Sequence, residues 1–293
     1  MKGRFVDGMS NEEYHSSGNV GKSKLDLVAK SPLHYIEKIH GYSASFRLGS
    51  AFHTFILENE KFKDEYIIPP TWGKRSKADR ALWEDYFISL GATGVTELPA
   101  AEWFNELQRQ TSKSLITEND VETIHKMAEG IARNQLASEL LTGGVAERSY
   151  FWKDTCGLTC QVRPDLYKPE DNIIVDLKTT DDAGEKEFAH TVFKYRYHVQ
   201  AAMYSYGVNA VEHKWPDFYF VVVEKTAPYC CAVYKLHEDV MDNGHELMIR
   251  DLETLAECVK NNEYPGYENN LELYTRIEHV PFKVSLDGQE VSV

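Results

Sequence analysis

The pattern of hydrophobic positions changes near residue 145 of the chain. Before that point, apolar residues recur three and four positions apart, which is typical of amphipathic helices. The clearest case is residues 46–58, whose apolar side consists of Leu48, Ala51, Phe52, Phe55 and Ile56. Helices are also expected to start near residues 10–13 and 23–28, the second stopping before Ser31-Pro32, and to cover 77–90, 99–110 and 118–141, the last as one long or two short helices. Residues 62–70 should be extended.

After Gly143-Gly144 the period becomes two, as in strands with one buried face. Three strands in succession are predicted over residues 146–153, 158–167 and 172–180, with turns between them. The rest of this half is expected to contain helices 185–193 and 197–207, strands 218–225 and 229–236, and helix 239–261. We therefore predict an α/β (α+β) fold, with a mixed central sheet flanked by helices and a helical N-terminal elaboration. Residues 1–293 should form one domain: a helical part to 145, a sheet core over 146–262 and an irregular tail over 263–293.

Composition narrows the class of protein. The 293 residues are 42% hydrophobic and 27% charged, which is ordinary for a soluble protein with a substantial core. No apolar run is long enough to span a bilayer, and the residues after Met1 are too polar for a signal peptide, so we expect a cytoplasmic protein without membrane contact. The five cysteines form no C-x-x-C pair, which argues against a zinc ribbon.

The strand over residues 172–180 carries unusual charges. Because strand side chains alternate, Asp176 and Lys178 share one face, while Val175 and Leu177 take the other. Asp165 lies across the predicted hairpin, so two carboxylates and an ammonium should meet at one point. Such a group suits a divalent metal and a water beside a phosphodiester, although a structural ion pair is the alternative.

Four ordered motifs turn this pattern into a family resemblance. Pro164-Asp165 with Asp176-Leu177-Lys178 resembles the PD-(D/E)XK nuclease signature. Residues 48–58 (LGSAFHTFILE) and residues 21–35, which include GKSKLD and SPLHY, resemble motifs of the exonuclease VIII (RecE-type) phage and prophage group. Residues 197–204, with Gln200 and Tyr204, resemble the Q-x-x-x-Y helix of RecB-type nucleases. The resemblance extends over residues 7–267 and implies a restriction-endonuclease-like core related to that of lambda exonuclease.

The resemblance implies roles for individual residues. Asp165 and Asp176 would be ligands of Mg²⁺, with Mn²⁺ as the other candidate, and the carbonyl of Leu177 would be a third ligand. Lys178 would orient the attacking water and stabilise charge on the phosphate; whether it also removes the proton is open. Glu147 and His53 would complete a site for two ions, against the alternatives of an exposed carboxylate and a packed core histidine.

Other residues are expected to contact the active site or DNA. Gln200 and Tyr204 share one helical face, where they could hold Lys178 or a phosphate. A pocket for a terminal 5′-phosphate is expected from Ser23, Lys24 and Arg163. Because the net charge is −14, DNA would need a local basic groove. The candidates for that groove are Lys74, Arg75, Lys77 and Arg80, with Lys22, Lys24, Lys30, Lys194 and Arg196.

The resemblance finally implies an activity. It is that of an Mg²⁺-dependent 5′→3′ exodeoxyribonuclease that leaves 3′ overhangs on double-stranded DNA for recombination by strand annealing. The expected partners are double-stranded DNA ends, a single-strand annealing recombinase and copies of the chain itself in a ring, with a tetramer favoured over a trimer, inside a bacterial host cell. The sequence has no G-x-x-x-x-G-K-[ST] motif, so the reaction should be independent of ATP. The alternatives are an inactive DNA-binding or scaffold protein of this fold, and an endonuclease or RNA-processing enzyme.

Overall fold

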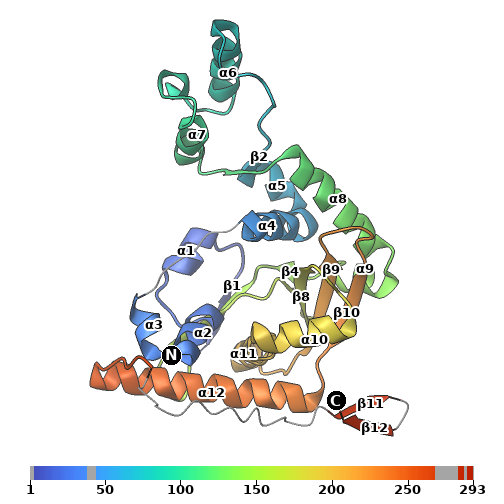
Figure 1. The fold of residues 1–293 in the computed structure, drawn as a ribbon. Helices are drawn as coiled ribbons and strands as arrows, with labels where there is room; N and C mark the ends of the chain where they lie inside the picture. Colours follow the sequence, from blue (N-terminus) through green and yellow to red (C-terminus); the bar gives the residue numbers. More distant parts are fainter. Residues whose placement is uncertain (1–2, 38–43, 268–282, 287–288, 293) are drawn as a thin grey trace.

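A five-stranded mixed sheet forms the centre of the fold (Figure 1). The computed structural model describes residues 3–37, 44–267, 283–286 and 289–292. The strand order is β10 (Cys231–Lys235), β9 (Asp217–Glu224), β8 (Ile173–Thr180), β7 (Leu166–Lys168) and β4 (Val145–Ala146). β8 and β9 run parallel, while the other neighbours are antiparallel. The predicted mixed sheet is confirmed.

A second sheet contains β1 (Arg4–Val6), β5 (Ser149–Lys153) and β6 (Thr159–Val162), in that order. The prediction of continuous strands over 146–153 and 158–167 was therefore wrong, because each stretch is divided between the two sheets. Glu147 separates β4 from β5 with a left-handed backbone, at φ 53°. Pro164 lies between β6 and β7, where a residue without an N–H cannot continue a ladder of hydrogen bonds.

Helices cover both faces of the five-stranded sheet (Figure 1). One face carries α4 (Ala44–Leu57), α8 (Glu118–Ala132) and α9 (Gln135–Leu140), and the other carries α10 (Glu185–Lys194), α11 (Tyr197–Glu212) and α12 (Glu238–Asn261). The alternation predicted for β8 is confirmed: Val175 and Leu177 pack in the core beside α4 and α8, whereas Ile174 packs in the core beside α11. Asp176 therefore faces α11.

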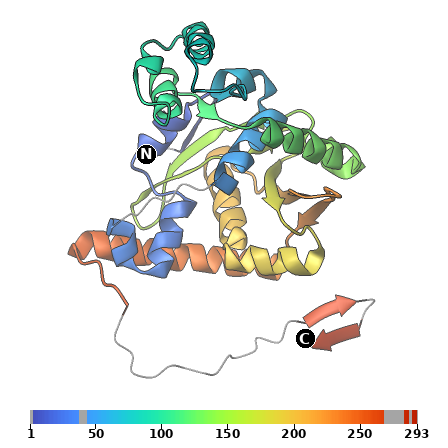
Figure 2. The ribbon, with the colours of Figure 1, turned by 45° about the horizontal axis from the view of Figure 1, so that its top comes forward.

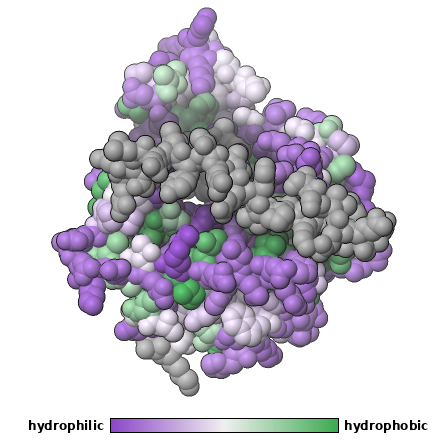
Figure 3. Space-filling model, turned by 60° about the horizontal axis from the view of Figure 1, so that its bottom comes forward, coloured by the Kyte–Doolittle hydropathy of each residue, from purple (hydrophilic) through white to green (hydrophobic). Residues whose placement is uncertain are grey.

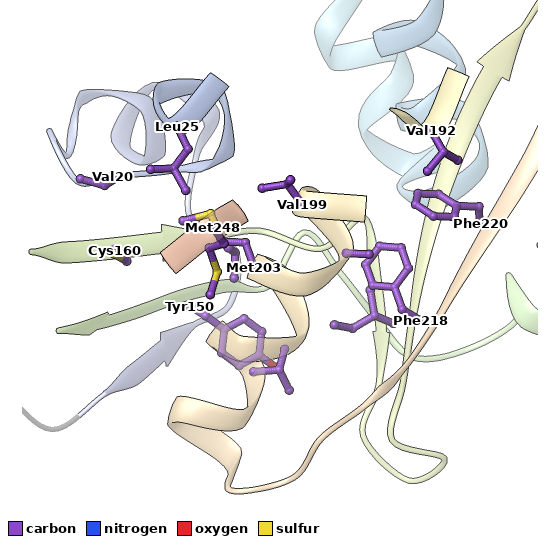
Figure 4. Close-up of a cluster of buried hydrophobic side chains, with 14 of the residues drawn as sticks. Val20, Leu25, Tyr150, Cys160, Val192, Val199, Met203, Phe218, Phe220 and Met248 are labelled. Carbon is purple, nitrogen blue, oxygen red and sulfur yellow. The ribbon is translucent and has the colours of Figure 1, made fainter. Parts of the chain in front are cut away.

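The core beside α11 joins the two sheets. Figure 4 shows Tyr150 and Cys160 of the smaller sheet, Met203 of α11 and Phe218 and Phe220 of β9 gathered around one buried cluster. α11 approaches the smaller sheet so closely at Gly207 that a Cβ there would lie 2.6 Å from side-chain atoms of Trp152 and Val162. The position of α11, which carries Gln200, is thus fixed by packing on both sheets.

A small helical unit with its own core is inserted between β2 (Tyr66–Ile67) and β3 (Ser114–Leu115), which pair in parallel. It consists of α6 (Lys77–Ser89), the 3₁₀ turn η1 (Val95–Glu97) and α7 (Trp103–Thr111). Figures 1 and 2 show it standing out beyond α4 and α5 (Asn59–Glu65). Its core is built mainly of Trp83, Phe87, Trp103 and Leu107. Both predicted helices are present, although α7 begins at Trp103 rather than at residue 99.

The remaining elements correct several local expectations. α1 (Asn11–Ser16) begins at the predicted helix start, where Ser10 and Glu13 form a capping box, and α2 (Lys22–Lys30) ends before Pro32 as expected. However, Pro32 opens another helix, α3 (Pro32–Glu37), because proline fits the first helical turn. Residues 62–65 belong to α5 and are not extended, and Asn134 caps α9, which divides 118–141 into two helices. In the tail, β11 (Lys283–Leu286) and β12 (Gln289–Ser292) form a hairpin, so these residues are not irregular; 268–282, 287–288 and 293 lie outside the described residues.

The surface is largely polar on the face that Figure 3 shows. Figure 3 shows one face of the molecule, whose coloured part is mainly hydrophilic. Among the residues that the structure describes, no helix has the length and apolar character needed to cross a membrane. All five cysteines are free thiols.

Candidate active site

Strand β8 places Asp176 at the centre of the site. Its side chain is completely buried and contacts the ammonium of Lys178, two residues further along the same face of the strand. Gln200 Nε2 donates a 2.6 Å hydrogen bond to Asp176 Oδ1. Oδ2 is buried as well and is the oxygen that contacts the ammonium of Lys178. Burial raises the pKa of Asp176 to about 6, although the charge of Lys178 acts against this rise.

Asp165 lies beside this group, at the residue before β7. The backbone N–H of Leu177 donates a 2.8 Å hydrogen bond to Asp165 Oδ2, which ties the loop between β6 and β7 to β8. Burial raises the pKa of Asp165, while Lys178 and the hydrogen bond from Leu177 lower it. The predicted convergence of Asp165, Asp176 and Lys178 is thus present in the structure.

Lys178 is a cation in this arrangement. Burial alone would lower the pKa of its ammonium, but the carboxylates of Asp176 and Asp165 outweigh burial, and the pKa is raised. The ammonium also lies 4.7 Å from the ring centroid of Tyr197. A lysine held in the charged form can orient a nucleophile or stabilise a phosphate, but it cannot accept a proton.

Glu147 forms the rim of the site nearest β4. Its Oε2 lies 2.7 Å from Nε of Arg163, and its N–H donates a 3.1 Å hydrogen bond to the carbonyl of Asp165. Burial and the neighbouring Asp165 raise the pKa of Glu147 to about 8, while Arg163 opposes this rise. Two carboxylates that repel each other in a partly buried place favour the binding of a cation.

His53 reaches the same carboxylates from α4. Its Nδ1 lies 3.5 Å from Asp165 Oδ2. Burial, followed by the charge of Lys178, lowers the pKa of His53 to about 4, so the imidazole is neutral near pH 7. A neutral imidazole is the form that binds metals.

The side chains of this site include the types of atom that bind a divalent metal ion. Asp165, Asp176 and Glu147 provide hard oxygen ligands, and the only side-chain partners of the buried Asp176 carboxylate among the described residues are Gln200 and Lys178. Among the described residues, no three His, Cys, Asp or Glu side chains already converge at metal-binding distances. The ammonium of Lys178 instead contacts Asp176, so metal binding would require these side chains to rearrange.

A cavity of about 590 Å³ opens beside Glu147, large enough for part of a polymeric substrate. Its polar lining includes Arg47, Ser50, Glu58, Lys61, Glu147 and Arg163. Lys61 is paired with Glu58 at 2.5 Å, and Arg47 Nη2 lies 3.7 Å from Asp120. Glu58 could have been noticed in the sequence, because it ends the same helical motif that carries His53.

The helix of the Q-x-x-x-Y motif provides three polar residues, of which only two were predicted. Gln200 contacts Asp176, as described above. Tyr204 packs its ring against Phe218 at a centroid distance of 6.4 Å, and burial raises its pKa well above the ordinary value, so the hydroxyl stays neutral. Tyr197, which contacts Lys178, was missed; its position three residues before Gln200 places it on the same helical face.

The residues predicted for a 5′-phosphate pocket have other contacts. Arg163 pairs with Glu147, hydrogen-bonds Asn11 and covers the ring of Tyr14 at 4.3 Å. Lys24 donates 2.6 Å hydrogen bonds to the carbonyls of Gly18 and Asn19. Ser23 is exposed on α2. Of the three, only Arg163 lines the cavity beside Glu147.

The predicted groove cations are scattered. In the helical insert, Lys74 covers the ring of Phe104 at 3.9 Å and Arg80 donates to the carbonyl of Thr96, whereas Arg75 and Lys77 are exposed. Arg196 is bound to Asp26 and Asp251. The other four lie elsewhere: Lys24 bonds the carbonyls of Gly18 and Asn19, Lys22 pairs with Asp26, Lys30 is exposed at the end of α2, and Lys194 is exposed at the end of α10.

Comparisons with known proteins identify a family and similar solved structures. The model of a family described as a PDDEXK-like domain of unknown function (DUF3799) matches residues 21–276. A candidate exonuclease from Eubacterium rectale has a similar solved structure, with TM-score 0.58 and 13% identity, covering 89% of this chain and 90% of that one. A phage-related exonuclease from Haemophilus somnus 129PT aligns with TM-score 0.29 and 14% identity, over 73% of this chain and 95% of that one. A search of curated proteins found no match.

The first of these solved structures supports the restriction-endonuclease-like fold, and the family match covers every residue of the site. Nucleases with this domain generally use divalent metal ions, in agreement with the oxygen-rich donor set. The chain belongs to the PDDEXK-like family DUF3799, in the PD-(D/E)XK nuclease superfamily.

Proposed function

We propose that this protein is an Mg²⁺-dependent exodeoxyribonuclease that hydrolyses one strand of duplex DNA from its 5′ end. The observation that supports it best is the group formed by Asp165, Asp176 and Lys178, with Gln200 bound to the buried Asp176. A purely structural ion pair would not need a second carboxylate and a neutral imidazole beside it, with a cavity opening at the neighbouring Glu147.

Each residue has a role in this proposal. Asp165, Asp176 and the carbonyl of Leu177 would hold one metal ion, with Glu147 and His53 available for a second. The bound ions would supply charge neutralisation and a water of lowered pKa. Lys178, a cation, orients that water and stabilises the negative charge that develops on the phosphate. Gln200 holds the carboxylate of Asp176 in position, and Arg163 does the same for Glu147.

The details of the proposed reaction rest on the resemblance to exonuclease VIII-type enzymes. They are 5′→3′ polarity, independence of ATP, production of 3′ overhangs and delivery of these to a single-strand annealing recombinase in a bacterial cell. A homo-oligomeric ring, favoured as a tetramer over a trimer, would explain how a chain with net charge −14 retains DNA. Exposed cations such as Arg75 and Lys77 would face the channel of that ring.

The proposal is tested with end-labelled linear and covalently closed circular duplexes incubated with Mg²⁺. An exonuclease releases label from linear DNA at a rate that depends on which end is labelled, and leaves closed circles intact. Cleavage of circles would instead establish an endonuclease. Binding without hydrolysis, in the presence of Mg²⁺ or Mn²⁺, would establish the non-catalytic alternative.

A further inference from the structure

A short aromatic segment connects the candidate active site to the surface. Tyr195, between α10 and α11, is 50% exposed and stacks on Tyr197 at a centroid distance of 5.8 Å and an angle of 30°. Tyr197 in turn lies against the ammonium of Lys178 at 4.7 Å. The rings of Tyr197 and Tyr195 therefore lead outward, one after the other, from Lys178.

The backbone that presents Tyr195 is firmly held. Lys22 Nζ donates a 2.7 Å hydrogen bond to the carbonyl of Tyr195. The next residue, Arg196, has a left-handed backbone with φ 55°, and its guanidinium is bound to the buried Asp251. A fixed backbone with a half-exposed ring is the arrangement of a preorganised contact residue.

The aromatic ring of Tyr195 lines a second cavity, of about 350 Å³, that begins where β8 ends. Thr179 and Thr180, the residues directly after Lys178, belong to its wall, and Lys194 and Lys225 also line it. Its carboxylates are those of Asp181, Asp182 and Glu187, of which Asp181 is paired with Lys225 at 2.9 Å. Three carboxylates against two ammonium groups repel a phosphate, so this cavity suits the uncharged base of a nucleotide better than its backbone.

We propose that Tyr195 is a stacking platform for the base of an unpaired nucleotide adjacent to the scissile phosphodiester. This inference rests on the proposed nuclease function and specifies its substrate: the strand in the active site is single-stranded at that position. A base paired within a duplex keeps both faces stacked on its neighbours, whereas an unpaired base can stack on an exposed aromatic ring.

Lys194 fits this role. Its ammonium lies 5.1 Å from the ring centroid of Tyr195, on an exposed surface. A cation over an exposed ring is held weakly, and base–aromatic stacking is the stronger contact, so an arriving base displaces the ammonium. Lys194, which lines the cavity beside Tyr195, is then available to meet the backbone phosphate.

The test measures binding of oligonucleotides that carry 2-aminopurine as the terminal base, in Ca²⁺ to limit hydrolysis. We expect the full-length protein to bind duplexes with an unpaired end more tightly than blunt duplexes, and to quench the emission of the unpaired base. Tyr195→Ala should weaken this binding about 5- to 100-fold and abolish the quenching, while Tyr195→Phe should behave as wild type. Tyr267→Ala, at another exposed tyrosine, is the matched control and should change neither signal.

The possible outcomes separate the stacking role of Tyr195 from the proposed nuclease function. Unchanged binding and quenching in Tyr195→Ala, equal affinity for blunt ends, or no binding of any oligonucleotide by the wild type would overturn the inference. If the wild type hydrolyses DNA in Mg²⁺ but Tyr195→Ala hydrolyses and binds it equally well, the stacking role alone fails. If binding and quenching depend on Tyr195 but no metal supports hydrolysis, the stacking role is supported and the proposed nuclease function fails.

Discussion

Gln200 of α11 donates a 2.6 Å hydrogen bond to Oδ1 of Asp176 of β8. Both side chains are buried, so this bond joins a helix to a strand in the interior of the protein. It fixes one oxygen of the carboxylate and leaves the other directed at Lys178. A buried carboxylate that loses such a donor has no water to replace it.

Gln200→Ala should therefore lower kcat/KM about 10- to 100-fold, corresponding to loss of a buried hydrogen bond to a charged group. Metal affinity should fall as well, because the carboxylate of Asp176 is no longer positioned. Steady-state hydrolysis and calorimetric titration of Mg²⁺ measure the two effects. Gln161→Ala is a suitable control: Gln161 is equally buried but bonds the carbonyl of Tyr14, so its loss should affect stability and not metal affinity.

Lys178→Met tests the role of the ammonium. The variant retains much of the side-chain volume, and hydrolysis should fall about 10²- to 10⁴-fold because a positioned charge is lost. Circular dichroism should be unchanged. Lys168→Met, at a lysine of the neighbouring strand β7 that bonds the carbonyl of Glu139, should retain activity. A Lys178→Met protein that is folded and retains a tenth of the activity would contradict the assignment.

The strand chemistry could be predicted from sequence because it depends on local geometry. Alternation in β8 places Asp176 and Lys178 on one face in any sheet that buries Val175 and Leu177. The division of the hairpin strands between two sheets could not be predicted in this way. Apolar and polar residues alternate in the same way in both sheets. The left-handed backbone of Glu147 does not change this alternation, so the sequence does not reveal it.

The contacts of long cationic side chains could not be predicted from the sequence either. Lys74 and Arg196 look alike in the sequence, as charges suited to a groove. In the structure, Lys74 covers the ring of Phe104, and Arg196 is bound to Asp251, which lies 55 residues away in the chain. Such contacts depend on tertiary packing. Tyr197 was missed for a different reason: its contact with Lys178 joins α11 to β8 and appears only in the three-dimensional structure.

Glu147 should make the stability of the metal-free protein depend on pH. Its pKa in the folded state, about 8, lies above the ordinary glutamate value of 4.5, so the folded state binds more protons between these values. Stability of the metal-free protein should therefore fall as the pH rises from about 4.5 to 8. A divalent metal competes with those protons, so its stabilising effect should be larger at pH 8 than at pH 5.5.

Thermal unfolding in EDTA and in Mg²⁺, at both pH values, measures this difference. Glu147→Gln should reduce the dependence of the EDTA series on pH. Glu84→Gln, at a glutamate of the separate helical insert, provides the comparison. An increase in Tm on adding Mg²⁺ that is the same at pH 5.5 and pH 8 would contradict the proposed link between Glu147 and the metal.

His53→Ala should lower the turnover rate more than it weakens DNA binding, since the imidazole contacts Asp165 and not the cavity wall. We expect about a 10- to 100-fold loss of kcat, as for other residues that hold or orient a metal ligand. His125→Ala provides the control, because His125 of α8 packs against Phe55, which belongs to α4 like His53. If His53→Ala lowers Tm strongly and leaves kcat unchanged, His53 is a core residue and not part of the site.

The ring proposed above makes a prediction about charge. A monomer with net charge −14 should bind DNA weakly, and a ring with Arg75 and Lys77 directed at its channel should bind it durably. Light scattering should therefore give a mass of three or four chains. The double variant Arg75→Glu/Lys77→Glu should shorten the tract degraded per binding event without lowering cleavage of short oligonucleotides, which need no channel. A strictly monomeric wild type, or a double variant with unchanged tract length, would refute this arrangement.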